Sequence, residues 1–156
     1  MKLIVIGGGA AGMFGAIAAK DAHAQADVVV LEASRRPLAK VRISGGGRCN
    51  VTHACFDPAQ LVTHYPRGNR ALRGPFSRFQ PKDTVAWFQQ RGVALKTEAD
   101  GRMFPVTDDS DTIVQCLLTT ARHRGIELRM STPVTDVTRV DDGFDVVLRS
   151  GECLRG

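Results

Sequence analysis

The feature that most constrains the fold is the first stretch of the chain, residues 1–32. An apolar run, Leu3–Ile6, leads into Gly7-Gly8-Gly9-Ala10-Ala11-Gly12, and an alanine-rich segment separates this motif from a second apolar run that ends before Glu32. The pattern predicts a strand, a tight turn, a helix over about residues 10–24 and a parallel strand. The sequence therefore predicts an α/β fold of the Rossmann type, organised around a nucleotide-binding turn.

The glycines of the motif have separate expected roles. Gly7 allows the bend, Gly9 lets a pyrophosphate approach the backbone, and Gly12 lets the helix pack close to the strand. The helix start, at Ala10 and Ala11, directs unpaired N–H groups and the positive end of the helix dipole at the phosphates. The motif alone is weak, because any glycine can belong to an ordinary turn, but its position between strand and helix favours nucleotide binding.

Glu32 follows Gly12 at the spacing that places a carboxylate on the ribose of a bound dinucleotide. A carboxylate accepts hydrogen bonds from a ribose diol and repels a 2′-phosphate, so a phosphorylated ribose is not expected here. The alternative interpretation of Glu32 is a solvated carboxylate at the end of a strand.

Composition indicates one globular domain: 156 residues, of which 43% are hydrophobic and 24% are charged. No apolar run approaches the roughly twenty residues that cross a bilayer, and the N-terminus lacks the pattern of a cleaved leader, so a cytoplasmic location is expected. The cysteines fall in no C-x-x-C pair and no metal spacing, which predicts free thiols and no metal site. They are Cys49, Cys55, Cys116 and Cys153.

The net charge of +5 raises the question of nucleic-acid binding. The arginines are spread along the chain, and the local excess is the cluster Arg67, Arg70, Arg73 and Arg78. We interpret this cluster as a solvated face or as a contact surface for another part of the protein. The expected partner is therefore a small-molecule substrate, without nucleic acid or membrane. No histidine pairs with a carboxylate at recognisable spacing, so no catalytic residue is assigned.

A second glycine loop, Ser44-Gly45-Gly46-Gly47-Arg48-Cys49-Asn50, is more specific than the first. Each glycine weakens a helix or strand by about 1 kcal/mol, so three in a row indicate close backbone approach to another group, most naturally a ligand. Lys40, Arg42 and Arg48 supply cations that suit phosphate or an electron-rich ring. The alternative is a mobile surface loop. Without a resolving cysteine nearby, Cys49 is interpreted as a small neighbour of a cofactor.

The rest of the chain alternates helices and strands. Helices are expected over residues 58–64, 71–79, 81–91 and 110–124. Strands are expected at residues 93–95, 102–104, 126–130, 134–140 and 144–148. Residues 152–156 look too short and too polar to complete the β-meander that begins there. The expected organisation is a βαβ unit with the second glycine loop over 1–53, a helical and hairpin excursion over 54–108, and a helix, a returning strand and a hairpin over 109–156.

Four sequence motifs together indicate a known family: Val5 to Gly12, Leu31-Glu32, Ile43 to Thr52, and Gly101-Arg102-Met103-Phe104-Pro105. Over essentially all 156 residues, the chain resembles the N-terminal part of the BaiN-like (YhiN, aminoacetone oxidase) family of FAD- and NAD(P)-dependent oxidoreductases. The resemblance implies a glutathione-reductase-type FAD-binding domain with an inserted domain. It also implies a flavoprotein that transfers hydride through FAD, with NAD(P)H or an organic substrate as the donor.

The resemblance also implies which residues meet the cofactor. The first loop would hold the FAD pyrophosphate, Glu32 the adenosine ribose, the backbone of Val134 the adenine, and the triple-glycine loop the flavin end. The candidate cofactor-binding residues are Gly7, Gly9, Ala10, Ala11, Gly12, Glu32, Ala33, Lys40, Ser44, Gly45, Gly46, Gly47, Arg48, Cys49, Asn50 and Val134.

Two departures from the family pattern stand out. Leu38-Ala39 precede Lys40 where the family usually has a glycine. Family members are also much longer, so we expect a truncated fragment that binds FAD weakly and turns over little. Other interpretations are a non-catalytic nucleotide-binding module, a plain NAD-binding Rossmann domain and an S-adenosylmethionine methyltransferase. The second glycine loop argues against the last two.

Overall fold

The structure is a computed structural model that describes all 156 residues, and the chain divides into two compact units. Unit 1 comprises residues 1–42 and 117–156, and unit 2 comprises residues 43–116. The glycine loop that starts at Ser44 lies in unit 2, whereas the predicted βαβ segment before it lies in unit 1. The reason is that Thr52 and His53 pair with a strand of unit 2.

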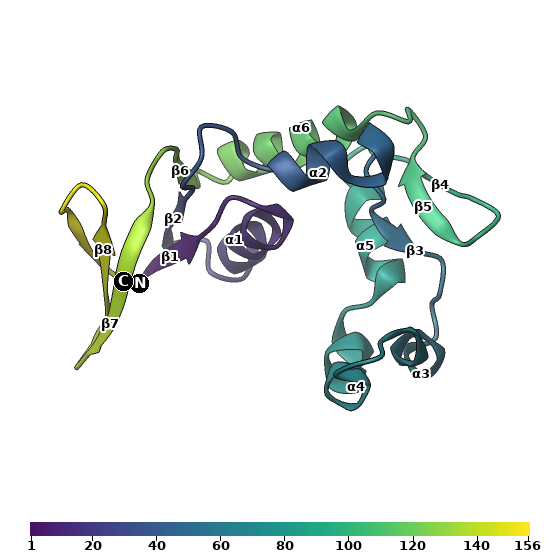
Figure 1. Cartoon of the computed structure of the whole chain (residues 1–156), viewed down its shortest axis with the longest axis horizontal. Coiled ribbons are helices and arrows are strands. Elements are labelled where there is room, and N and C mark those ends of the chain that lie inside the picture. The colour runs from purple at the N-terminus through teal and green to yellow at the C-terminus, as the bar shows by residue number, and fades with distance from the viewer. The chain divides into compact units, whose positions relative to one another are not determined.

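Unit 1 is built on a three-stranded parallel sheet in the order β1-β2-β6. Its strands are β1 (Lys2–Ile6), β2 (Asp27–Leu31) and β6 (Glu127–Arg129), and the helix α1 (Ala10–Ala22) connects β1 to β2 (Figure 1). The predicted βαβ unit and returning strand are therefore confirmed. Residues 28–31 of the middle strand are at most 1% exposed, which explains why β2 is a continuous apolar run.

The helix α1 packs on this sheet through small and apolar side chains. Met13, Ala16 and Ile17 are fully buried, and their spacing places them on one face of the helix. The helix contacts both β1 and β2. One face of the sheet is therefore sealed by residues whose helical spacing is visible in the sequence.

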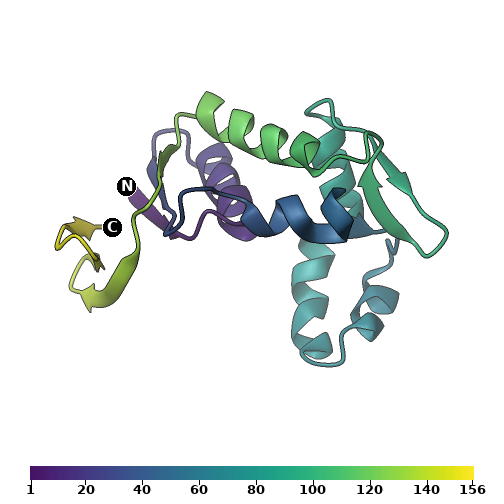
Figure 2. The same cartoon turned by 45° about the horizontal axis from the view of Figure 1, so that its top comes forward.

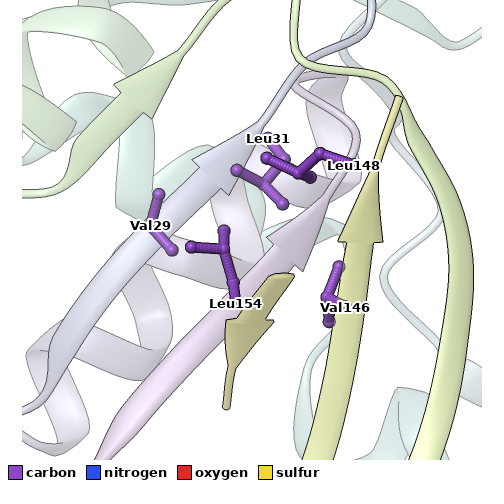
Figure 3. Close-up of a cluster of buried hydrophobic side chains, with 5 residues drawn as sticks. All are labelled: Val29, Leu31, Val146, Leu148 and Leu154. Carbon is purple, nitrogen blue, oxygen red and sulfur yellow. The ribbon is translucent and has the colours of Figure 1, made fainter. Parts of the chain in front are cut away.

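An antiparallel meander packs on the sheet of unit 1. It consists of β7 (Val134–Val140), β8 (Gly143–Leu148) and β9 (Cys153–Arg155), in the order β7-β8-β9. The prediction that residues 152–156 cannot complete the meander is wrong. Leu154 joins a buried cluster, and Phe144 and Gly156 exchange two backbone hydrogen bonds of 2.7 and 3.0 Å. Figure 3 shows the side chains of this cluster converging from sheet and meander: Val29, Leu31, Val146, Leu148 and Leu154.

Unit 2 combines short helices with a small antiparallel sheet in the order β3-β5-β4 (Figure 2). The strands are β3 (Thr52–His53), β4 (Leu95–Thr97) and β5 (Arg102–Pro105). The helices are α3 (Pro58–Leu61), the 3-10 turn η2 (Val62–His64), α4 (Asn69–Arg78) and α5 (Pro81–Gln89). The predicted helices and the hairpin are confirmed, whereas β3 was not predicted.

The helix α6 (Ser110–His123) belongs to unit 2 up to Cys116 and to unit 1 from Leu117. It carries the predicted apolar stripe, because Ile113, Leu117 and Ala121 are all buried.

No helix is long and apolar enough to cross a membrane. No group of histidine, cysteine and acidic side chains could hold a metal ion, and all four cysteines are free thiols.

Candidate functional site

The turn between β1 and α1 has the close packing that its glycines predict. Gly7 adopts a φ of +102°, and its N–H donates to the carbonyl of Leu31 at 2.8 Å. A Cβ on Gly12 would lie 1.9 Å from the carbonyl oxygen of Gly7 and 3.3 Å from Cγ1 of Val5. Only glycine fits at this position, because the helix otherwise could not approach the strand.

The N-terminus of α1 offers hydrogen-bond donors that the protein leaves open. The first helical hydrogen bond runs from the N–H of Met13 to the carbonyl of Gly9 at 2.9 Å, so the three preceding N–H groups have no partner inside the helix. The first turn has no acidic residue, and Gly9 provides no side-chain cap. A Cβ on Gly9 would meet no atom within 4 Å. The residues are thus arranged to accept an anionic group.

Glu32 lies across the turn and helps to hold its shape. Its Oε2 accepts the N–H of Gly8 and its Oε1 accepts the N–H of Ser34, both at 2.7 Å. Partial burial raises the pKa of Glu32, but the hydrogen bonds from Ser34 and Gly8 outweigh this and leave the pKa below its usual value. The carboxylate is therefore ionised at neutral pH. Each oxygen keeps a lone pair for a further donor such as a ribose hydroxyl.

Gly8 is a part of this turn that the sequence-based prediction missed. It is buried, and a Cβ there would lie 3.1 Å from both Cβ and Oε2 of Glu32. Its carbonyl accepts the N–H of Leu38 at 2.8 Å. The sequence did contain a signal for this role, because the motif requires glycine only at Gly7 and Gly9 before the helix, yet position 8 is also glycine.

The structure also brings the segment before β7 next to Glu32. The N–H of Thr132 donates to the carbonyl of Glu32 at 2.8 Å, and the N–H of Ser131 donates to the carbonyl of Ser34 at 2.9 Å. Val134 follows Thr132 by two residues and begins β7. Ala33, which is exposed, lies between Glu32 and Ser34. The predicted adenosine-side residues Glu32, Ala33 and Val134 are therefore gathered in unit 1.

Leu38 shows what the departure from the family pattern does to the backbone. Its φ is +58°, a left-handed conformation that glycine adopts easily and leucine rarely does. The side chain is 1% exposed, so burial of an apolar group accompanies the strained backbone. Lys40 follows in the short helix α2 (Ala39–Ile43) with an exposed side chain.

The triple-glycine loop of unit 2 is left-handed over three consecutive residues. Gly45, Gly46 and Gly47 have φ values of +57°, +70° and +86°. A Cβ on Gly45 would lie 2.7 Å from Cε1 of Phe104, whereas a Cβ on Gly46 would meet no atom within 4 Å. The close approach that the sequence predicted is thus made to Phe104 at Gly45, and open space remains at Gly46.

Arg48 has partners within unit 2. Its guanidinium lies 4.1 Å from the ring centroid of Phe104, and it forms ion pairs with Glu98 and, at 3.5 Å, with Asp108. Asp108 also pairs with Lys96, whose hydrogen bond is the main cause that lowers the pKa of Asp108. The charge of Arg48 is therefore balanced by the protein, although the sequence suggested a cation for a ligand.

Cys49 is 5% exposed and has a φ of +63°. Burial raises the pKa of its thiol and outweighs the opposing hydrogen bond with Ser44. The thiol is therefore protonated and a poor nucleophile, as the non-redox interpretation of Cys49 requires. Asn50, beside it, is exposed.

A parallel strand-turn-helix with a glycine-rich turn and an acidic residue after the second strand defines a nucleotide-binding domain of the Rossmann type. The chain belongs to the family described as HI0933-like protein Rossmann domain, whose sequence model matches residues 1–155. The predicted family and the predicted Rossmann-like α/β fold class are thereby confirmed.

Two curated proteins are similar to nearly the whole chain. One is the ribosomal RNA dihydrouridine synthase of Escherichia coli (strain K12), 28% identical over 145 residues, which are 93% of this chain and 35% of that protein. The other is the 3-dehydro-bile acid delta(4,6)-reductase of Clostridium scindens, 26% identical over 143 residues, which are 92% of this chain and 34% of that protein. The chain thus spans about a third of the length of these relatives.

Among solved structures, the chain is similar to the open conformation of a flavocytochrome c3 fumarate reductase. The TM-score is 0.68 at 20% identity, over 93% of this chain and 30% of that one. At this identity the likeness shows a shared fold. The family and the shared fold agree that the chain is a domain of the Rossmann type.

Proposed function

We propose that this chain is the FAD-binding part of an oxidoreductase. The observation that carries the proposal is the turn from Gly7 to Gly12, where unpaired N–H groups at the start of α1 lie beside the ionised carboxylate of Glu32, which accepts the N–H of Gly8. The donors suit a pyrophosphate and the acceptor suits a ribose diol, as the adenosine diphosphate half of FAD requires.

The residues of unit 1 divide the binding of that half between them. The N–H groups of Ala10, Ala11 and Gly12 donate to the pyrophosphate, and Gly9 leaves room for it. Glu32 accepts from the ribose, and the backbone at Val134 meets the adenine. The loop from Ser44 to Asn50, with Lys40, is proposed for the flavin end on the family resemblance. When bound, FAD supplies the capacity to accept and donate a hydride.

The proposed substrates follow from the chemistry that the relatives' names share. A dihydrouridine synthase and a delta(4,6)-reductase both act on carbon–carbon double bonds. We therefore propose a substrate with such a bond and NAD(P)H as the electron donor. Because one relative is named for ribosomal RNA, the expectation of no nucleic-acid partner is not retained here. A cytoplasmic location stays a prediction.

The proposal is tested by purifying the chain, adding FAD, desalting and recording the absorbance near 450 nm, where the isoalloxazine ring absorbs. Because weak binding is expected, the chain should carry a substoichiometric amount of flavin through desalting, and a Glu32→Ala variant should carry much less. A colourless chain that binds NAD instead contradicts the proposal. Bound flavin that neither NADH nor NADPH bleaches favours the alternative, a non-catalytic nucleotide-binding module.

A further inference from the structure

Gly8 and Glu32 lie against each other across the turn of unit 1. The N–H of Gly8 donates to Oε2 of Glu32 at 2.7 Å, and a Cβ on Gly8 would lie 3.1 Å from both Cβ and Oε2 of Glu32. Relaxed contacts of a carbon atom begin at about 3.3 Å with oxygen and at about 3.5 Å with carbon. Position 8 therefore has room for a hydrogen atom beside the carboxylate but not for a methyl group.

The backbone conformation of Gly8 is not what requires a glycine. Its φ lies outside the left-handed region, whereas the neighbouring Gly7 has a φ of +102°. The close approach to Glu32 is therefore the feature of position 8 that excludes a side chain. A Gly8→Ala substitution changes the space beside Glu32 and does not place a side chain on a left-handed backbone.

Hydrogen bonds fix the backbone on both sides of this contact. The carbonyl of Gly8 accepts the N–H of Leu38 at 2.8 Å. The N–H of Glu32 donates to the carbonyl of Arg129, and the carbonyl of Glu32 accepts the N–H of Thr132, each at 2.8 Å. Neither backbone can retreat without breaking one of these bonds. A methyl group at position 8 would therefore displace the part of Glu32 that can move, which is its carboxylate.

Two backbone donors hold the carboxylate of Glu32 in one orientation. Its Oε2 accepts the N–H of Gly8 and its Oε1 accepts the N–H of Ser34, both at 2.7 Å. Rotation of the carboxylate breaks at least one of these bonds, so its remaining lone pairs have a fixed arrangement before any ligand binds. Pre-organised acceptors favour binding, because little side-chain freedom is lost when the ligand arrives.

We propose that Gly8 is a positioning residue, whose N–H and missing side chain together hold the carboxylate of Glu32 where it accepts hydrogen bonds from the adenosine ribose. Gly8 itself does not touch the ribose and acts through Glu32. The inference deepens the proposed function by naming the residue that sets its selectivity for ribose over 2′-deoxyribose. It rests on that function for the ligand, but not for the coupling between Gly8 and Glu32.

The selectivity is tested by titration calorimetry with FAD and with the FAD analogue whose adenosine lacks the 2′-hydroxyl. We expect the wild-type chain to bind FAD roughly tenfold more tightly than the analogue, because the lost hydrogen bond has a charged acceptor. Gly8→Ala should bring this ratio close to one, since the carboxylate is displaced.

Gly9→Ala is the matched control for the selectivity. A Cβ on Gly9 meets no atom of the protein within 4 Å and would occupy the space proposed for the pyrophosphate. This variant should weaken both ligands equally and keep the wild-type ratio. An unchanged ratio in Gly8→Ala overturns the proposal, since loss of structure alone weakens both ligands alike. A ratio near one in a wild-type chain that binds FAD overturns it as well.

The coupling is tested without cofactor by urea denaturation of Gly8→Ala, Glu32→Ala and the double variant. Because Gly8→Ala already breaks the hydrogen bond, Glu32→Ala should cost less stability in that background than in the wild-type chain. The difference should be roughly two- to tenfold in the unfolding equilibrium constant, the usual contribution of one hydrogen bond. Equal costs in the two backgrounds overturn the positioning role.

If Gly8→Ala does not fold, nuclear magnetic resonance of the wild-type chain decides. The chemical shift of the Gly8 amide proton should follow the ionisation of Glu32 as the pH is lowered from 7, and Glu32→Gln should abolish this titration. An amide shift that does not titrate overturns the positioning role. Since the denaturation and resonance measurements need no flavin, they can succeed while FAD binding fails, and the reverse.

Discussion

The substitution Gly12→Ala probes the contact on which the proposed nucleotide turn depends. The new Cβ would lie 1.9 Å from the carbonyl oxygen of Gly7 and 3.1 Å from its carbonyl carbon. A relaxed contact between carbon and oxygen is about 3.3 Å or longer, so α1 or the turn must move by more than about 1 Å. Both atoms belong to the backbone, which cannot swing aside as a flexible side chain can.

The expected cost combines two opposing effects. Overpacking of this kind costs about 1–3 kcal/mol, while alanine is favoured over glycine inside a helix by about 1 kcal/mol. Gly15→Ala is the matched control, because Gly15 lies in the same helix and a Cβ there would meet no atom within 4 Å. The control gains the helix propensity without the clash. The two variants should therefore differ in unfolding free energy by about 1–3 kcal/mol.

Urea denaturation followed by far-ultraviolet circular dichroism measures this difference, and flavin retention after desalting measures the consequence for binding. We expect Gly15→Ala to be at least as stable as the wild-type chain and to retain FAD. Gly12→Ala should be less stable and lose FAD. A Gly12→Ala chain as stable as Gly15→Ala would refute the reasoning, since it would show that helix and strand do not meet at Gly12.

Three further predictions follow from single residues. The pKa of Glu32 lies below its ordinary value of 4.5 in the folded chain, so its contribution to stability is present above that pH and lost as the pH falls through the folded pKa. The unfolding free energies of wild type and Glu32→Gln should therefore converge in acid, and a constant difference from pH 7 to pH 3 would speak against it. Leu38→Gly should be about 1 kcal/mol more stable than Leu38→Ala in urea denaturation, because both lose the same packing but only glycine relieves the left-handed backbone. Gly45→Ala should melt at a lower temperature than Gly46→Ala, since both strain the backbone but only the first meets Phe104, and equal melting temperatures would contradict this.

The βαβ unit could be predicted from sequence because its determinants are local. The apolar run of β2, the buried positions Met13, Ala16 and Ile17 of α1, and the spacing from Gly12 to Glu32 all lie within 32 residues. The apolar stripe of α6 could be predicted for the same reason, because its helical spacing repeats within one element. Local patterns of this kind specify both the element and its buried face.

Features that depend on distant partners could not be predicted. Arg48 pairs with Glu98, fifty residues away, so its charge could not be assigned from the loop alone. The strand β9 forms because Leu154 reaches a cluster that includes Val29 and Leu31, although its own sequence is short and polar. Gly8 could not be assigned because its partner, the carboxylate of Glu32, was predicted to face only the ribose.

The central claim is that the turn of unit 1 holds the adenosine diphosphate half of FAD. Titration calorimetry of the chain with FAD and with FMN, which lacks the adenosine and one of the two phosphates, tests it most directly. The account predicts binding of FAD and none of FMN at the same concentrations, with FAD binding reduced in Glu32→Ala. FMN bound as tightly as FAD, or FAD binding unaffected by Glu32→Ala, would contradict it.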